Sequence, residues 1–144
     1  MSTPSTISIV TENGKVDTIY CHWDGYVSNM GKMLLEHYNS KEKAKSIIDN
    51  GYASSISEKI APSTDTHSFS TPEKGVCVFY HRDRGDLLEI DTFSSISQML
   101  NKVGQSHNYI FYGEKWYYCK DYDIFNTMLI PLELAIKRDE VESL

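Results

Sequence analysis

The chain has 144 residues, of which 40% are apolar, and it carries a formal net charge of −6. This length and apolar content suit a single domain, residues 1–144, built on one core. The acidic charge excludes the broad basic surface that duplex nucleic acid requires, so we expect no such partner. The sequence shows neither a signal sequence nor an apolar run of membrane-spanning length, which predicts a cytoplasmic protein without a membrane partner.

The N-terminal part of the chain predicts a β-hairpin. Ser5–Thr11 alternates between apolar and polar residues and is rich in β-branched side chains, as strands are. Asn13-Gly14 is a strong signal for a two-residue hairpin turn, and Lys15–Trp23 returns as the second strand. Because side chains alternate along a strand, Cys21 and Trp23 would face the core, and His22 and Asp24 would face outward.

Two helices are predicted next. Val27–Tyr38 carries apolar residues at helical spacing, and Gly31 on that apolar stripe would let another backbone segment come close. Lys41–Asn50 has the pattern of a shorter helix, with Ser40 as its N-cap and Gly51 directly after it.

The middle of the chain predicts less regular structure. Ser54–Ile60 has the pattern of a weak helical turn, and the Ser-, Thr- and Pro-rich segment 61–74 is predicted to be a flexible loop. Gly75–His81 is a nearly continuous apolar run, which is typical of a central strand. The chain would then turn at Arg84-Gly85 and form another strand over Leu87–Phe93.

The C-terminal part predicts a helix, a hairpin and a last helix. Ser95 and Gln98 have capping-box spacing at the start of a helix over Ile96–Val103. Asn108–Tyr112 and Lys115–Cys119 would pair across a Gly-Glu turn. Pro131 is a suitable first residue for a helix over 131–144. The fold class is therefore α+β, with three to four helices on a mainly antiparallel sheet of about five to six strands.

The three cysteines predict buried thiols. Cys21, Cys77 and Cys119 are odd in number and include no close pair, which argues against a disulfide framework and against a zinc knuckle. Each lies in an apolar stretch, where a thiol behaves as a small apolar side chain.

Two His-x-Asp triplets, His22-Trp23-Asp24 and His81-Arg82-Asp83, each lie at the end of a predicted strand. If the two strand ends were neighbours, two imidazoles and two carboxylates could bind a divalent metal such as Mn²⁺ or Zn²⁺ and activate a water. This pattern supports one hypothesis, a metal-dependent hydrolase of a nucleotide or nucleic acid. The alternative is that these side chains hydrogen-bond to turn amides and hold the strand ends in place.

The segment HRDRGD supports a second interpretation. Arg82 and Arg84 would share one face, and two guanidinium groups side by side suit a phosphate or carboxylate. Aromatic rings nearby could stack on a base. The candidate ligand-binding residues are Trp23, Asp24, Tyr26, Tyr80, Arg82, Asp83 and Arg84. The alternative is a salt-bridged turn in which the arginines pair with neighbouring aspartates.

These same residues carry a resemblance to a known family. The segments TISIVTENGKVDTIYCHWDGY, GKMLLEHY, GVCVFYHRDRGD and NYIFYGEKWYY resemble a family of small proteins from bacteriophages and prophage-bearing bacteria. The resemblance covers about Ser5–Tyr118 and implies a phage or mobile-element origin, with no particular reaction. In the family pattern a residue other than His often precedes RDRG, which favours Trp23, Asp24 and the arginines over His22 and His81.

The leading functional prediction is therefore a small, non-enzymatic binding protein that needs no cofactor. Its partner would be a host protein, in a host-takeover or anti-defence role, or a nucleotide-like ligand that it sequesters. A third alternative is an oligomeric structural protein, in which the aromatic hairpin Tyr109–Cys119 forms a self-interface.

Overall fold

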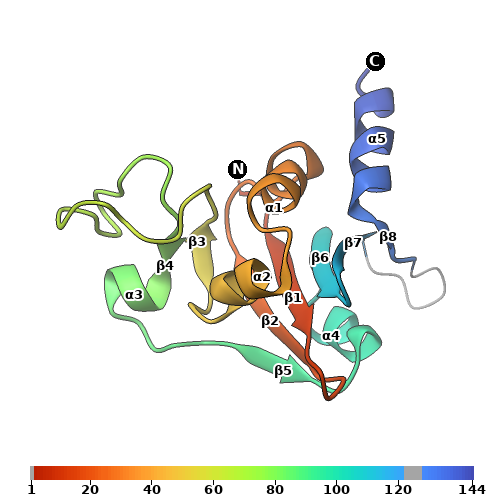
Figure 1. Cartoon of the computed structure of the whole chain (residues 1–144), viewed down its shortest axis with the longest axis horizontal. Helices are drawn as coiled ribbons and strands as arrows, with labels where there is room; N and C mark the ends of the chain where they lie inside the picture. The colour runs from red at the N-terminus through yellow and green to blue at the C-terminus, as the bar shows by residue number, and fades with distance from the viewer. Residues whose placement is uncertain (1, 122–127) are drawn as a thin grey trace.

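The computed structural model describes residues 2–121 and 128–144, and its centre is a twisted, mixed β-sheet (Figure 1). Within those residues the sheet has eight strands, listed here in chain order: β1 Ser5–Val10, β2 Val16–Cys21, β3 Ala53–Ser55, β4 Val78–Phe79, β5 Asp91–Phe93, β6 His107–Tyr112, β7 Lys115–Lys120 and β8 Ile130–Pro131. The helices are a π-helix over Val27–Gly31, then α1 Lys32–His37, α2 Lys41–Ile48, α3 Tyr80–Arg84, α4 Ile96–Val103 and α5 Leu132–Glu142.

The strand order is β4-β3-β2-β1-β6-β7-β8, and β5 pairs with the end of β2 that β3 leaves free. The pairs β1–β6 and β2–β3 are parallel, and the other pairs are antiparallel. The α+β class and the mainly antiparallel pairing are thus confirmed. The sheet has more strands than the five or six predicted, because four of them are only two or three residues long and give a weak sequence signal.

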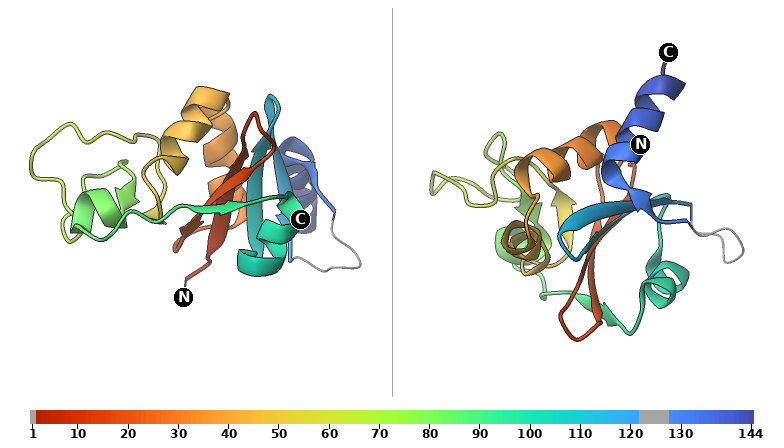
Figure 2. Two further views of the ribbon diagram at one scale, coloured as in Figure 1. Left: turned by 90° about the horizontal axis from the view of Figure 1, so that it is seen from below. Right: turned by 45° about the vertical axis from the view of Figure 1, so that its right-hand side comes forward.

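Helices cover both faces of the sheet. Figure 2 shows α2 and α4 on opposite sides of the β1–β2 hairpin. The larger core lies under α1 and α2 and contains the sheet side chains Ile7, Ile9, Tyr109, Phe111 and Trp116. The smaller core lies under α4 and contains Val16, Met99, Leu100, Ile110 and Cys119. No helix in the described part of the chain has the length and apolar character that crossing a membrane requires.

The predicted helix over Val27–Tyr38 begins as the π-helix and continues as α1. Its apolar stripe is buried as predicted, apart from partly exposed Leu35. Gly31 does allow a close approach, but of side chains rather than of a backbone. A Cβ there would lie 3.3 Å from Leu132 Cδ1 and 3.6 Å from Ile136 Cγ1, so α5 packs directly on this glycine.

The polar N-caps of α2 and α4 are confirmed. The Ser40 hydroxyl accepts the Lys43 N–H at 3.2 Å, and the Ser95 hydroxyl accepts the Gln98 N–H at 3.0 Å. The Gln98 side chain reaches back one residue further than a capping box predicts, to the N–H and hydroxyl of Ser94. These bonds satisfy amides that a helix start otherwise leaves free.

Replacing Ser95 with alanine is expected to lower the free energy of unfolding by about 1 kcal/mol, since one helix-terminal amide loses its acceptor. Ser97→Ala, at an exposed position inside the same helix, is the matched control and should leave stability unchanged or slightly raised. Urea unfolding of both variants measures the difference. Equal effects of the two substitutions would mean that the cap does not contribute.

Three predicted elements are wrong, and all three lie in the middle of the chain. Ser54–Ile60 begins inside the strand β3 and forms no helical turn, because β3 pairs in parallel with β2 through Ala53 and Cys21, 32 positions apart in the sequence. Gly75–His81 is not a central strand: only β4 pairs, at the edge of the sheet, and the chain enters helix α3 at Tyr80. The strand predicted over Leu87–Phe93 is limited to β5.

Candidate functional site

Arg82 and Asp83 form a structural network rather than an open ligand clamp. The Asp83 side chain is only 4% exposed and accepts hydrogen bonds from Arg82 Nε at 2.8 Å, Arg82 Nη2 at 3.0 Å and the Phe79 N–H at 2.9 Å. Arg82 also donates to the carbonyls of Ile60 and Cys77. The network therefore ties α3 to both ends of the loop 61–74.

His67, which has no sequence signal beyond its place in that loop, completes the network. Its side chain is 2% exposed, and its Nδ1 accepts the Glu73 N–H at 2.9 Å. In the neutral ring the proton must then be on Nε2, which lies 3.2 Å from Asp83 Oδ2 and donates to it. Both ring nitrogens are buried and hydrogen-bonded, to the Glu73 N–H and to Asp83, so His67 holds the loop against α3 and has no free nitrogen to act as a general base.

The loop itself is held by Glu73. The Glu73 carboxylate accepts the N–H and hydroxyl of Ser63 and of Thr64 at 2.8–3.1 Å. Phe69, near the middle of the loop, donates its N–H to the Asp83 carbonyl at 3.1 Å. The loop thereby places the Phe69 ring against Tyr80, with ring centroids 5.7 Å apart.

Arg84 is also internally paired. Its guanidinium lies over the adjacent rings of Phe69 and Tyr80, with Cζ 4.5 and 4.6 Å from their centroids. Its Nε and Nη2 donate to the two oxygens of Asp86 at 3.0 and 2.7 Å, and these hydrogen bonds hold the pKa of the Asp86 carboxyl below its usual value. Both arginines are therefore paired with neighbouring aspartates, as in the salt-bridged turn that the sequence analysis gave as the alternative.

A pocket of about 440 Å³ opens beside α3, and it contains two of the seven predicted ligand-binding residues, Tyr80 and Arg84. We call it the tyrosine pocket. Its walls come from β2, from the residue before β3, from α3 and from the segment that follows α3. The lining residues are Tyr20, Tyr52, Tyr80, His81, Arg84, Asp86, Leu87 and Glu89.

Backbone hydrogen bonds fix the walls of the tyrosine pocket. The Tyr80 N–H donates to the Tyr52 carbonyl at 3.2 Å, and the Tyr52 N–H donates to the Glu89 carbonyl at 3.1 Å. The chain can pass this closely only at Gly51, which has a φ of +76° and where a Cβ would lie 2.8 Å from Leu88 Cδ1. The pocket is therefore part of the fold and does not depend on mobile side chains alone.

Tyr20 and Tyr52, which line this pocket, are neutral. Burial raises the pKa of the Tyr20 hydroxyl, and neighbouring Tyr80 and Cys21 add to the effect. Burial and a hydrogen bond to Asp91 raise the pKa of Tyr52. The two rings lie against each other at 5.9 Å between centroids. At neutral pH the site thus presents uncharged aromatic rings.

The segment YCHWDGY forms a corner at the end of β2. Trp23 does not face the core as predicted: it is 42% exposed, because regular pairing with β1 ends at Cys21. Asp24 is exposed in the left-handed region with a φ of +56°. Gly25 then packs so closely against Ser5 that a Cβ at position 25 would lie 2.6 Å from Ser5 Cβ. Exposed Tyr26 precedes the π-helix. Trp23 approaches the tyrosine pocket only through the ring of His22, which contacts Tyr20.

The four predicted metal ligands make separate contacts. His22 Nδ1 is hydrogen-bonded to the Tyr20 hydroxyl at 2.8 Å, and His81 Nδ1 lies 2.7 Å from the Asp86 carbonyl. Asp24 is exposed at the corner, and Asp83 is held inside the network described above. Among residues 2–121 and 128–144, no three His, Cys, Asp or Glu side chains gather in a group that could hold a metal ion.

The three cysteines are buried, as predicted. Burial raises the pKa of the Cys21 thiol to about 12, and it also raises the pKa values of Cys77 and Cys119. At neutral pH these sulfurs are thiols and not nucleophilic thiolates.

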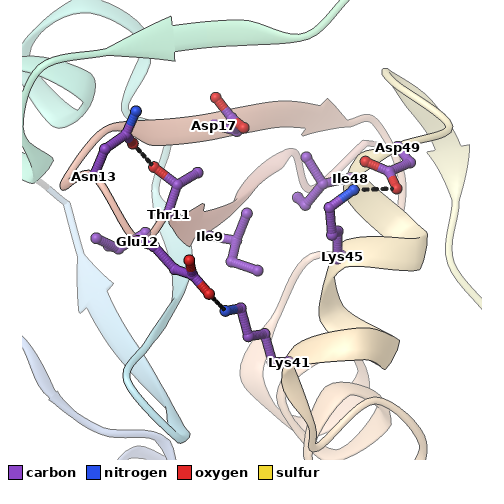
Figure 3. Close-up of a pocket in the computed structure, with 10 residues that line it drawn as sticks. Ile9, Thr11, Glu12, Asn13, Asp17, Lys41, Lys45, Ile48 and Asp49 are labelled. Atoms are coloured by element: carbon purple, nitrogen blue, oxygen red, sulfur yellow. Dashed lines mark hydrogen bonds and ion pairs between the residues drawn. The ribbon is translucent and has the colours of Figure 1, made fainter.

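A second pocket, of about 460 Å³, lies between the β1–β2 turn and α2 (Figure 3). The sequence predicted both elements but not that they lie side by side. Ile9 and Ile48 form its apolar floor, and its two lysines are paired with carboxylates: Lys41 with Glu12 at 2.7 Å and Lys45 with Asp49 at 2.8 Å. None of the predicted site residues lines it.

Comparison of the chain with protein families, with curated proteins and with solved structures gives no match.

Proposed function

We propose that the chain is a non-enzymatic binding protein of phage or mobile-element origin that binds a host protein through the tyrosine pocket. The observation that supports the proposal most directly is the pocket itself: three tyrosines, a histidine and an ion-paired arginine surround about 440 Å³. Tyrosine and arginine side chains dominate the energetics of protein–protein interfaces, since they offer large contact areas with polar tips.

The rim of the pocket supports a protein partner over a small ligand. Leu87 lines the pocket and is 87% exposed on the segment that follows α3. A folded protein does not expose a leucine to stabilise itself, because apolar side chains gain free energy only when they leave water. A partner surface that covered the rim would bury Leu87.

The arginines argue against the alternative of a sequestered nucleotide. A phosphate would need guanidinium N–H groups that are free to donate. Arg82 instead donates to Asp83 and to two carbonyls, and Arg84 donates to Asp86 through two nitrogens. Binding an anion at Arg82 would first require breaking its contacts with the buried Asp83 carboxylate, and at Arg84 an anion would compete with Asp86.

A photo-crosslinking amino acid at position 87, in the protein produced in bacterial cells, is expected to give one discrete adduct with a host protein. The added change Tyr80→Ala should abolish that adduct, because it removes a pocket wall. The adduct is identified by mass spectrometry. The matched control carries the crosslinker at position 141, which is 66% exposed on α5, a helix at the opposite end of the molecule from α3 (Figure 1). If positions 87 and 141 give the same adducts, or if position 87 gives none, the proposal fails.

A further inference from the structure

We infer that the tyrosine pocket accepts a positively charged side chain, a lysine or arginine on the surface of the partner. This inference rests on the proposed function and reverses the charge that the two arginines of HRDRGD suggest. It follows from the charge and the aromatic rings that line the pocket once the ion pair between Arg84 and Asp86 is counted as neutral.

The first argument is the charge of the lining. One arginine and two acidic residues, Asp86 and Glu89, line the pocket. Arg84 and Asp86 neutralise each other through the paired hydrogen bonds between them. The exposed carboxylate of Glu89 then gives the lining a net charge of −1. The chain as a whole also carries −6, so its long-range field attracts cations.

The second argument is the chemistry of the aromatic rings that line the pocket. The faces of aromatic rings are regions of negative electrostatic potential and attract ammonium and guanidinium groups. Tyr20 and Tyr52 offer two such rings. The Tyr52 hydroxyl donates its proton to Asp91, and a hydrogen bond to a carboxylate makes the ring more electron-rich. The structure already shows the same preference beside the pocket, where Arg84 lies over the rings of Phe69 and Tyr80.

The third argument concerns the source of the cation. A free alkylamine would fill the pocket but leave Leu87 in water. A lysine or arginine that projects from a protein surface would enter the pocket while its apolar neighbours cover this leucine, and the long side-chain stem would pack along the pocket wall. We therefore assign the pocket to a basic side chain flanked by apolar residues.

The test uses the complete chain and four probes: the peptide acetyl-Leu-Lys-Leu-amide, the same peptide with norleucine in place of lysine, butylammonium and adenosine monophosphate. The binding of each is followed by the NMR shifts of Tyr20, Tyr52 and Arg84. The lysine peptide is expected to bind at least about fivefold more tightly than the norleucine peptide, which is the ratio that one cation–aromatic contact gives. Adenosine monophosphate is expected to leave these shifts unchanged.

Two pairs of variants locate the effect. Glu89→Gln should weaken binding of the lysine peptide by about fivefold, whereas Glu114→Gln, the same charge change on the β6–β7 turn, should not. Tyr20→Leu should weaken binding, and Tyr20→Phe, which keeps the ring, should retain it. Because Glu89 is exposed, its replacement tests the inference even if a Tyr20 variant does not fold.

The inference is overturned if the two peptides bind equally, if none of the cationic probes binds, or if adenosine monophosphate shifts the pocket signals. If butylammonium binds as tightly as the lysine peptide, the assignment of the pocket to a side chain of a partner protein is wrong. Each of these results leaves the crosslink from position 87 as an independent measure of the proposed function. Loss of that crosslink together with intact lysine-peptide binding would instead reject the proposed function.

Discussion

Replacing Asp83 with alanine is expected to lower the free energy of unfolding by about 3 kcal/mol, one of the two largest effects we predict for a single change. The reason is the group that the substitution leaves behind. The Arg82 guanidinium, on a side chain that is 25% exposed, would lose its carboxylate partner. His67 Nε2 and the Phe79 N–H would also lose their acceptor. An unpaired, largely buried charge costs more than the pair itself contributes.

Asp86→Ala is the matched control, since it removes the carboxylate of the neighbouring, exposed pair with Arg84. It should leave the midpoint of urea unfolding close to that of the wild type, because ion pairs in water contribute little. Similar losses in both variants would mean that Asp83 belongs to an ordinary surface pair.

The same carboxylate gives a pH dependence. Burial by itself would raise the pKa of Asp83, but hydrogen bonds from Arg82, Phe79 and His67 outweigh burial and hold the pKa below 3.8. A group whose pKa is depressed in the folded state stabilises the fold above its unfolded pKa. The contribution of Asp83 is therefore complete above about pH 4 and is lost as the pH falls through the folded-state value. The alanine variant should lack this part of the acid dependence.

Gly25→Ala is expected to destabilise the protein by about 3 kcal/mol, through overpacking at the corner that follows β2. A Cβ at position 25 would lie 2.6 Å from Ser5 Cβ and 2.7 Å from the Thr3 carbonyl oxygen. Neither can move freely, since the Gly25 N–H donates to that carbonyl and Ser5 is paired in β1. The Gly25 carbonyl also accepts the buried Tyr109 hydroxyl at 2.7 Å.

The control for this substitution is Gly14→Ala in the β1–β2 turn. Gly14 has a φ of +82° but nothing within 4 Å of a Cβ, so alanine there should cost only the strain of the left-handed conformation, about 1 kcal/mol. Thermal and urea unfolding measure the loss of stability in both variants. Gly25→Ala reports the cost of the steric contact, and Gly14→Ala reports the cost of the left-handed backbone conformation. If the two losses were equal, the contact between Gly25 and Ser5 would not carry the effect.

The sequence predicted those elements whose signals are local. The signals for the caps Ser40 and Ser95 and for the Gly-Glu turn of β6 and β7 each lie within four positions of one another. The β1–β2 hairpin is also confirmed, but Val10 pairs with Val16, so its loop is longer than the two-residue turn predicted. Short strands in the middle of the chain depend on distant partners. Val78 pairs with Ser55, and Cys21 pairs with Ala53, and neither pairing has a signal in the neighbouring sequence.

The site shows the same division. HRDRGD marked the right part of the chain, because alternating arginines and aspartates indicate ion pairing. It could not show which carboxylate each arginine would use. That choice depends on His67 and Ile60, which reach Asp83 and Arg82 from 15 or more positions away. Likewise, Tyr20 and Tyr52 become neighbours of Tyr80 only when β2, β3 and β4 have assembled.

The parallel pairing of β1 with β6 has a consequence for the protein while it is being made. β1 lies inside the sheet, between β2 and β6, but its partner residues on the β6 side begin at His107. A ribosome that adds 5–20 residues per second needs roughly 5–20 s to synthesise the segment between them. During that time the nascent hairpin exposes an open strand edge with Ile7 and Ile9 on it, which other chains can pair with. The yield of soluble protein should therefore depend on translation speed and on chaperones more strongly than the stability of the finished fold suggests.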